Sequence, residues 1–257
     1  MTSTTSQTII TSTANPRLKA LRKLAQKRER ERRGCFAAEG EDLLAAAARN
    51  GVEMLEGFRL AGSQVPGGAA LYELSAQALA AVSTLGSGSR AIGVYEQRWG
   101  APAGPLCVYL HGVADPGNVG TVIRAAEAFG ASCVALGGGC ADPYSPKAVR
   151  ASMGAIFAVP LARVHDVGEL PGERIALTTD AREELEGAGY RLERPCTVLV
   201  GAEREGLPEA IVRACERSAR IAIASQSLNA AMAATVALYE LTRGAARAAP
   251  SSRVRTS

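Results

Sequence analysis

From Leu106 onward, short apolar stretches alternate with stretches of helical periodicity, and this alternation constrains the fold of the 257-residue chain most. The expected buried strands are Leu106–Leu110, Cys133–Leu136, Ile175–Thr178, Thr197–Val200 and Arg220–Ala224. The expected helices between them are Val119–Phe129, Lys147–Met153, Pro208–Cys215 and Leu228–Arg243. Such alternation predicts an α/β fold with a parallel sheet covered by helices. Sheets of this kind bind ligands in the loops that follow the carboxyl ends of their strands.

The N-terminal part of the chain predicts a separate, smaller α/β domain over residues 14–98. Asn15-Pro16 is typical of a helix start, and Leu18, Leu21, Leu24 and Ala25 then form one apolar stripe. A second helix is expected over Glu41–Arg49, and short apolar pieces separated by turn residues follow it. The Gly- and Pro-containing segment 99–105 is the predicted linker to a C-terminal domain over 106–246. The ends, 1–13 and 247–257, are expected to be disordered tails.

A concentration of positive charge marks the first helical region. Nine Lys and Arg residues lie between Arg17 and Arg33, opposed by only two Glu residues. Such a stripe is typical of a surface that binds a polyanion. A solvated helix face explains the stripe equally well at this point.

Composition limits the remaining classes of function. The chain is 47% hydrophobic and 21% charged, and its longest apolar runs, such as Ala230–Leu238, are too short to cross a bilayer. No secretory signal is apparent at the N-terminus, so we expect a cytoplasmic protein without a membrane partner. Six scattered cysteines and two histidines predict buried free thiols and no metal site.

The loop after the first predicted strand contains polar side chains next to a helix start. Asn118 is a plausible cap for that helix, and Gly120 and Arg124 share one of its faces. Because helical side chains lean toward the N-terminus, Arg124 should reach back toward the loop. This arrangement suggests an anion or phosphate site. The alternative is a surface Arg124 that pairs with Glu127.

Two later loops also follow predicted strands. Gly201–Pro208 contains glycines that permit close backbone approach to a ligand, with Glu203 at the turn. The segment Arg220–Asn229 leads into an Ala-rich helix, for which Ser227 or Asn229 could be the cap.

In combination, these blocks resemble the three signature motifs of the SpoU/TrmH branch of the SPOUT methyltransferases. The blocks are DPGNVGTVIRAAEAFGA, GAEREGLP and SLNAAMAATVALYE, in this order. The stretch ADPYSPKAVRASMGAIF (141–157) and the N-terminal segment TSTANPRLKALRKLAQKRERERRGCFAAEGEDLL add to the resemblance. The resemblance implies a trefoil-knotted catalytic domain, a homodimer formed through that domain, S-adenosylmethionine (SAM) as cofactor, and methyl transfer to a ribose 2′-OH in structured RNA.

The resemblance also implies roles for individual residues. The implied catalytic residues are Asn118, Arg124, Glu203, Ser227 and Asn229. Gly201, Ile221 and Leu228, with Thr179 at the preceding strand end, are the implied cofactor residues. The basic residues expected to contact RNA are Arg17, Lys19, Arg22, Lys23 and Arg150. Arg124 is the residue that the family assigns to activating the 2′-hydroxyl.

One departure from the family pattern leaves alternatives open. The segment from Ile221 to Ser227 is shorter than the usual family loop, and Ala222 replaces a common proline. An RNA-binding or assembly factor with a decayed cofactor site is therefore one alternative. A tRNA methyltransferase is another, although the long N-terminal extension favours 23S rRNA. A nucleotide-dependent oxidoreductase is disfavoured, because Gly86–Ala91 fits G-x-G-x-x-A but precedes a strand-like stretch.

Overall fold

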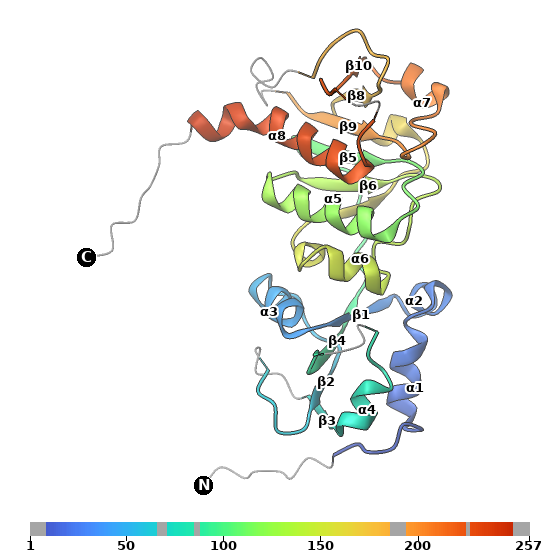
Figure 1. The fold of residues 1–257 in the computed structure, drawn as a ribbon, viewed down its shortest axis with the longest axis vertical. Helices are drawn as coiled ribbons and strands as arrows, with labels where there is room; N and C mark the ends of the chain where they lie inside the picture. The colour runs from blue at the N-terminus through green and yellow to red at the C-terminus, as the bar shows by residue number, and fades with distance from the viewer. Residues whose placement is uncertain (1–8, 66–70, 85–87, 186–193, 225–226, 249–257) are drawn as a thin grey trace, which may run out of the picture. The chain divides into compact units, whose positions relative to one another are not determined.

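The computed structural model describes residues 9–65, 71–84, 88–185, 194–224 and 227–248, with side chains up to residue 243. The chain packs into two compact units (Figure 1). The first contains residues up to Arg98 together with Asp142–Ala158, and the second contains Trp99–Ala141 and the chain from Val159 onward. Parts of the predicted tails, 1–8 and 249–257, lie outside the described residues.

The first unit is built on a four-stranded sheet with the order β1-β4-β2-β3. Its strands are β1 (Cys35–Glu39), β2 (Glu56–Leu60), β3 (Tyr72–Leu74) and β4 (Ala91–Glu96). Its helices from this part of the chain are α1 (Pro16–Lys23), α2 (Lys27–Arg33), α3 (Glu41–Arg49) and α4 (Ala76–Ala80). The pairs β1·β4 and β4·β2 are antiparallel, whereas β2·β3 is parallel. The predicted small α/β domain is therefore observed.

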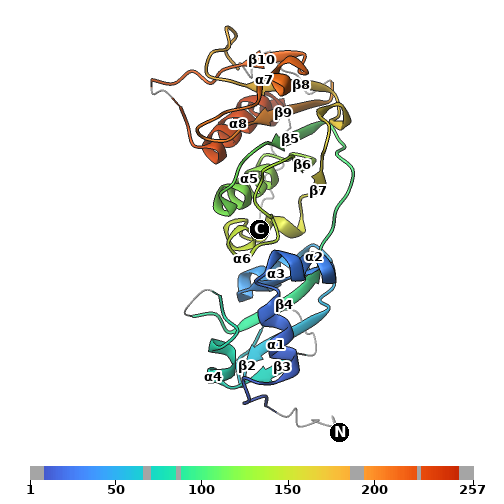
Figure 2. The same cartoon turned by 90° about the vertical axis from the view of Figure 1, so that its right-hand side faces the viewer.

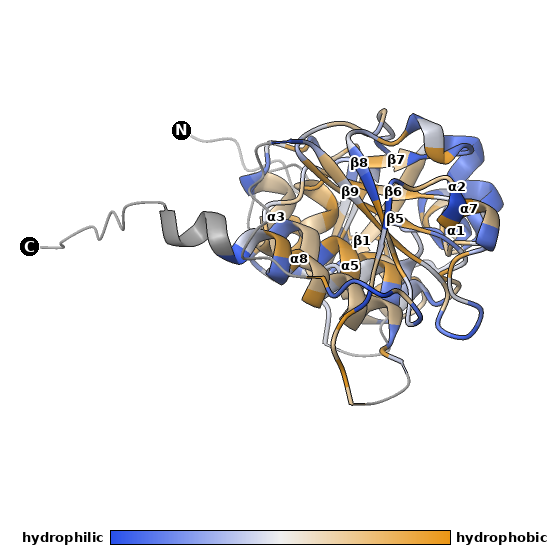
Figure 3. Ribbon diagram, turned by 90° about the horizontal axis from the view of Figure 1, so that it is seen from above, coloured by the Kyte–Doolittle hydropathy of each residue, from blue (hydrophilic) through white to orange (hydrophobic). Residues whose placement is uncertain are grey.

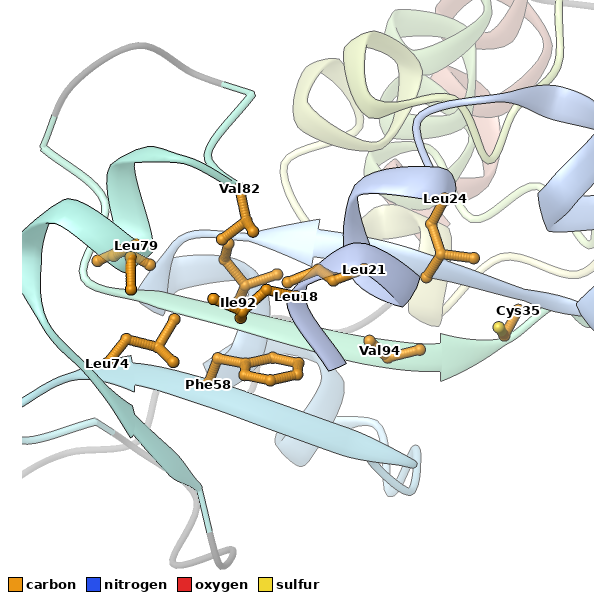
Figure 4. Packing of buried hydrophobic residues seen from close by; sticks show 11 residues of the cluster. Leu18, Leu21, Leu24, Cys35, Phe58, Leu74, Leu79, Val82, Ile92 and Val94 are labelled. Carbon is orange, nitrogen blue, oxygen red and sulfur yellow. The ribbon is translucent and has the colours of Figure 1, made fainter. Parts of the chain in front are cut away.

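The apolar stripe of the first helix forms the core of this unit (Figure 4). Leu18, Leu21 and Leu24 pack with Phe58 and Ile92 of the sheet, and all five are buried. The predicted fourth member of the stripe, Ala25, is exposed because α1 ends at Lys23. The side chain of Asn15 accepts a hydrogen bond from the backbone of Arg17, which confirms the predicted helix cap.

A turn between α1 and α2 interrupts the basic stripe, and the side chain of Arg30 is buried instead of exposed. Its side chain is 3% exposed and forms an ion pair with Asp142 at 2.6 Å. Arg30 also donates hydrogen bonds to the carbonyl oxygens of Leu24 and Ala25, at 2.7 and 2.8 Å. A buried guanidinium needs such partners, since an unpaired buried charge is costly. Arg30 therefore does not contribute to the basic surface that the sequence predicted for this segment.

Residues 142–158 pack with the first unit, although the sequence predicted one continuous catalytic domain from 106 to 246. They form α6 (Pro146–Ala151) and the 3-10 helix η1 (Ala155–Phe157). The ring of Phe36 on β1 lies 4.8 Å from that of Tyr144 and 5.9 Å from that of Phe157. Aromatic packing therefore joins this segment to the first unit. No sequence pattern within the segment indicates that partner.

The second unit contains a six-stranded parallel sheet with the order β10-β8-β9-β5-β6-β7. Its strands are β5 (Leu106–Leu110), β6 (Cys133–Leu136), β7 (Leu161–Arg163), β8 (Glu173–Leu177), β9 (Cys196–Val200) and β10 (Arg217–Ala219). Its helices are α5 (Pro116–Ala128), the 3-10 helix η2 (Val167–Glu169), α7 (Glu209–Arg213) and α8 (Ala230–Ala248). This unit confirms the predicted parallel α/β class, while the implied trefoil knot stays a prediction.

Alternating side chains of the strands bury both faces of this sheet. Helices α5 and α8 lie side by side on one face (Figures 1 and 2), and apolar residues recur along both (Figure 3). On the other face, Tyr109 and Leu199 belong to a buried cluster with Leu207, against which Ile211 and Val212 of α7 pack. The predicted linker pairs with the edge strand β7: the Gly100 amide donates to the carbonyl of Leu161 at 2.8 Å.

Both predicted tail boundaries need small corrections. Ile10, in the predicted tail, pairs with Leu74 of β3, and α8 continues two residues into the predicted C-terminal tail. All six cysteines are free and four are buried, as expected. Within the described ranges, no helix combines the length and hydrophobicity that a bilayer crossing needs.

Candidate active site

The loop after β9 folds back tightly on itself. Gly201 is buried, and a Cβ atom at this position would lie 2.1 Å from the carbonyl carbon of Gly206. The amide of Gly206 donates to the carbonyl of Ala202 at 2.9 Å, and Gly206 has a φ of +65°. Two glycines are thus required here, one for close approach and one for a left-handed backbone. The tight turn leaves the side chain of Glu203 exposed at the tip of the loop.

The N-terminus of α5 is capped by Asp115, whose side chain accepts from the amide of Asn118 at 3.0 Å. Asn118 was expected to be the cap, and this was wrong. The helix begins three residues earlier than predicted, because Pro116 occupies its first turn, where a missing N–H costs nothing. The Asn118 side chain is consequently available for contacts with other loops.

A chain of side-chain hydrogen bonds joins three loops that are distant in sequence. The Asn118 Nδ2 atom donates to Glu203 of the second loop. Its Oδ1 atom accepts from Asn229 of the third loop at 3.1 Å. Asn229 in turn caps α8, because its Oδ1 atom accepts from the amide of Ala231 at 2.9 Å. Three of the five predicted catalytic residues therefore form one connected network.

Arg124 lies on the same helix as Asn118, six residues further along, which corresponds to about 9 Å of helical rise. Its side chain is exposed. The alternative pairing with Glu127 does not occur, and within the described part of the chain Arg124 forms no ion pair. A helical side chain leans toward the N-terminus, so this guanidinium can reach toward the Asn118 end of α5.

A pocket of about 980 Å³ opens beside this network in the second unit. All four predicted cofactor residues line it, namely Thr179, Gly201, Ile221 and Leu228. Glu203 and Ser227 line it as well. Its volume is typical of a site for a small molecule or cofactor. Parallel strands β8 and β9 deliver their following loops to the same edge of the sheet, which explains why these segments meet.

The segment from Arg220 to Ala224 was expected to be a strand, and this was wrong. Strand β10 ends at Ala219. Beyond it, Arg220 pairs with the segment after β8: its amide donates to the carbonyl of Glu183 at 2.9 Å. Residues 221–223 then line the pocket instead of extending the sheet.

Several pocket residues were missed by sequence reasoning, including Thr178, Asp180, Arg204 and Arg220. Thr178 and Arg220 directly follow β8 and β10, Arg204 lies in the Gly201–Pro208 loop, and Asp180 is next to the predicted Thr179. Position after a strand was therefore the available signal. Both positively and negatively charged side chains line the pocket. Arg220 pairs with Glu184 at 2.6 Å, and Glu209 pairs with Arg213 of α7 at 3.4 Å.

A histidine and a tyrosine lie at the same edge of the sheet, near the end of β5. The Tyr109 hydroxyl and His111 Nδ1 are 3.0 Å apart. Burial lowers the pKa of His111 and raises the pKa of Tyr109 to about 12. Both groups are therefore neutral near pH 7. Within the described residues, no group of three or more His, Cys, Asp or Glu side chains could hold a metal ion.

The predicted RNA-contacting residues all belong to the first unit, where several have intramolecular partners. Arg17 pairs with Glu56 at 2.6 Å and lies over the ring of Tyr72. Arg150 pairs with Asp42 at 2.8 Å.

Arg22 donates to the backbone carbonyl of Thr13. Lys19 and Lys23, one helical turn apart on α1, are exposed, and neither forms an ion pair with a described residue.

Two known protein families match this chain, one in its N-terminal part and one in its C-terminal part. The profile of the SpoU rRNA Methylase family matches residues 105–239. The profile of the MRM3-like substrate binding domain matches residues 15–92. The first match contains the segments after β8, β9 and β10 that line the pocket, and the second contains the basic helices α1 and α2.

Individual relatives agree with these matches. The chain is 30% identical to the 23S rRNA (guanosine(2553)-2′-O)-methyltransferase RlmP of Bacillus subtilis, over 90% of this chain and 98% of that protein. It is 38% identical to the 23S rRNA (uridine(2479)-2′-O)-methyltransferase of Streptomyces viridochromogenes, but that match spans only 50% of this chain and 49% of that enzyme. The crystal structure of an AdoMet-bound rRNA methyltransferase from Sinorhizobium meliloti is 32% identical and covers 92% of this chain and 97% of its own, with a TM-score of 0.80.

Proposed function

Because the chain belongs to the SpoU rRNA methylase family, we propose that it transfers a methyl group from SAM to a ribose 2′-OH in 23S rRNA. One observation carries the proposal. The network of Asn118, Glu203 and Asn229 joins the N-terminus of α5 to two walls of the 980 Å³ pocket. A donor bound in the pocket would therefore lie beside the face of α5 that presents Arg124.

The pocket suits SAM in volume and in the chemistry of its walls. Gly201 keeps the backbone free of side-chain bulk, and Ile221 and Leu228 offer apolar surface for an adenine ring. Thr179 adds a hydroxyl at the end of β8. When bound, SAM supplies an electrophilic methyl group on a sulfonium, so that in-line positioning of the acceptor provides much of the rate.

Arg124 acts on the RNA side of the reaction. A guanidinium stays protonated in proteins and is a poor base, so its main role is to orient the 2′-hydroxyl and the neighbouring phosphate. Asn118 and Glu203 hold the N-terminus of α5 and the loop after β9 in position relative to each other. Asn229 and Ser227 fix the loop that precedes α8. The proton of the hydroxyl leaves to solvent as the methyl group is transferred.

The substrate is structured RNA, bound by the first unit through phosphate contacts. Lys19 and Lys23 are best placed for such contacts, since Arg17, Arg22 and Arg150 already have partners within the chain. The similar enzymes of Bacillus subtilis and Streptomyces viridochromogenes are both named as 23S rRNA methyltransferases, which favours rRNA over tRNA. The cytoplasm, where ribosomal RNA is accessible, is the proposed compartment.

We also propose a homodimer formed through the second unit. Met232 and Tyr239 on α8 are 57% and 50% exposed, and Tyr239 makes an edge-to-face contact with Phe129 at the end of α5. Large apolar side chains exposed along one helix are typical of a protein–protein contact. A second copy of the chain would bury them.

The test separates cofactor binding from catalysis. Arg124→Ala should bind SAM with near wild-type affinity in calorimetry yet lose methylation of 23S rRNA. Glu127→Ala, which removes another exposed charged side chain from α5, is the control and should remain active. Wild-type turnover by Arg124→Ala would rule out the proposed role. No SAM binding by the wild-type protein would favour an RNA-binding factor with a decayed cofactor site, as the short Ile221–Ser227 loop allows.

The RNA target is identified in cells. Mapping 2′-O-methyl positions in RNA from cells with and without the gene should reveal one 23S rRNA position that depends on the protein. Loss of a tRNA modification instead would overturn the proposed substrate.

A further inference from the structure

The walls of the pocket carry an excess of negative charge. Five described carboxylates line it, against two guanidinium groups: Asp180, Glu184, Glu203, Glu205 and Glu209 against Arg204 and Arg220. Three of the five are already engaged in hydrogen bonds or ion pairs. Glu184 pairs with Arg220, Glu203 accepts from Asn118, and Glu209 pairs with Arg213.

The two remaining carboxylates belong to Asp180 and Glu205. Both side chains are exposed at the pocket wall, and neither forms a hydrogen bond or ion pair with a described residue. Asp180 lies in the turn that follows β8, and the next residue, Ala181, is buried. Burial of Ala181 therefore constrains the backbone next to Asp180. Glu205 lies in the tight loop that Gly206 closes.

Donor and product of the proposed reaction differ by one charge. Methyl transfer forms a bond between the ribose O2′ and the methyl carbon and breaks the bond between that carbon and sulfur. The electron pair of the broken bond stays on sulfur, so the sulfonium becomes a neutral sulfide, and the hydroxyl proton leaves to solvent. SAM carries a net charge of +1, whereas S-adenosylhomocysteine carries none.

We infer that Asp180, assisted by Glu205, makes the pocket select the cationic donor over the neutral product. The inference rests on the proposed function and deepens it. The two unpaired carboxylates outnumber Arg204, the one guanidinium of the described lining without an ion pair. The remaining negative charge attracts the sulfonium form and has little effect on the sulfide form. The pocket therefore binds SAM more tightly than S-adenosylhomocysteine, and this difference makes release of the product easier after each turnover.

The size of the effect follows from Coulomb's law at a solvated wall. One carboxylate several ångströms from the sulfonium, screened by water and salt, changes affinity about three- to tenfold. The same carboxylate has no comparable effect on an uncharged sulfide.

Calorimetry with the full-length protein tests this selectivity. Binding of SAM and of S-adenosylhomocysteine is measured for the wild type, Asp180→Asn, Glu205→Gln and the double variant. Asp180→Asn should weaken SAM binding about three- to tenfold and product binding less than twofold. The double variant should bind SAM more weakly still. Added salt should reduce the difference in SAM affinity between the variants and the wild type.

Glu127→Gln is the matched control, since it removes one negative charge from an exposed position that does not line the pocket. It should leave both affinities unchanged. Equal weakening of donor and product by Asp180→Asn would overturn the inference, because it would indicate a hydrogen bond to the shared adenosine moiety. Unchanged SAM binding in the double variant would overturn it as well. If the wild-type protein binds neither compound, the proposed function itself fails, which is a distinct result.

Discussion

Replacement of Asn229 should separate two functions that one side chain performs. Its Oδ1 atom caps α8 through the amides of Ala231 and Met232, and its Nδ2 atom donates to Asn118. Loss of a helix cap costs about 1 kcal/mol. Loss of an exposed hydrogen bond costs roughly 0.5 kcal/mol. Asn229→Ala should therefore lower the free energy of unfolding by about 1.5 kcal/mol, and the melting temperature by about 3–6 °C.

Asn229→Asp distinguishes the two functions. It keeps an oxygen acceptor for the cap, and its negative charge at a helix N-terminus contributes roughly 0.3–1 kcal/mol. The substituted carboxylate cannot donate to Asn118, so the third loop loses its connection to α5. We expect near wild-type stability in urea denaturation together with a loss of methylation on the order of 10- to 100-fold, because small misplacements at a reacting centre have effects of this size.

Two outcomes would refute this reasoning. If Asn229→Asp loses as much stability as Asn229→Ala, the cap does not stabilise α8 as its geometry indicates. If it methylates RNA at the wild-type rate, the bond to Asn118 does not position the loops. Circular dichroism of both variants establishes whether α8 remains folded.

Three further variants test other parts of the argument. Gly201→Ala places a methyl group against the backbone of its own loop and should weaken SAM binding at least about fivefold by calorimetry, at a cost of roughly 1–3 kcal/mol. Asp142→Asn leaves the buried guanidinium of Arg30 without its counter-charge and should lower the free energy of unfolding by about 3 kcal/mol in urea. Arg174 lowers the pKa of Glu216 to about 2 by donating hydrogen bonds to its carboxylate, and a lowered pKa stabilises the fold at higher pH. Arg174→Met should therefore be less stable than the wild type at pH 6, and this difference should disappear as the pH falls from about 4.5 to about 2.

The local sequence determined the elements of the fold and the chemistry of the site. Periodicity placed β5 and β6 at their observed bounds. Asn15 was recognised as a cap, and Asn229 as one of two candidate caps beside Ser227, because capping depends on a few adjacent residues. The resemblance to the SpoU/TrmH motifs supplied the four pocket residues that were expected to hold the cofactor.

Tertiary structure decided which distant segments meet. The departure of Arg220–Ala224 from the sheet depends on pairing with the segment after β8, and the burial of Arg30 depends on Asp142, more than 100 residues away. The sequence does not show that Asp180 lacks an ion-pair partner, because the pairing of nearby carboxylates such as Glu184 with Arg220 is seen only in the structure. Hydrogen bonds, ion pairs and burial between distant segments are long-range interactions. They leave no periodic signal in either partner, so the sequence alone does not reveal them.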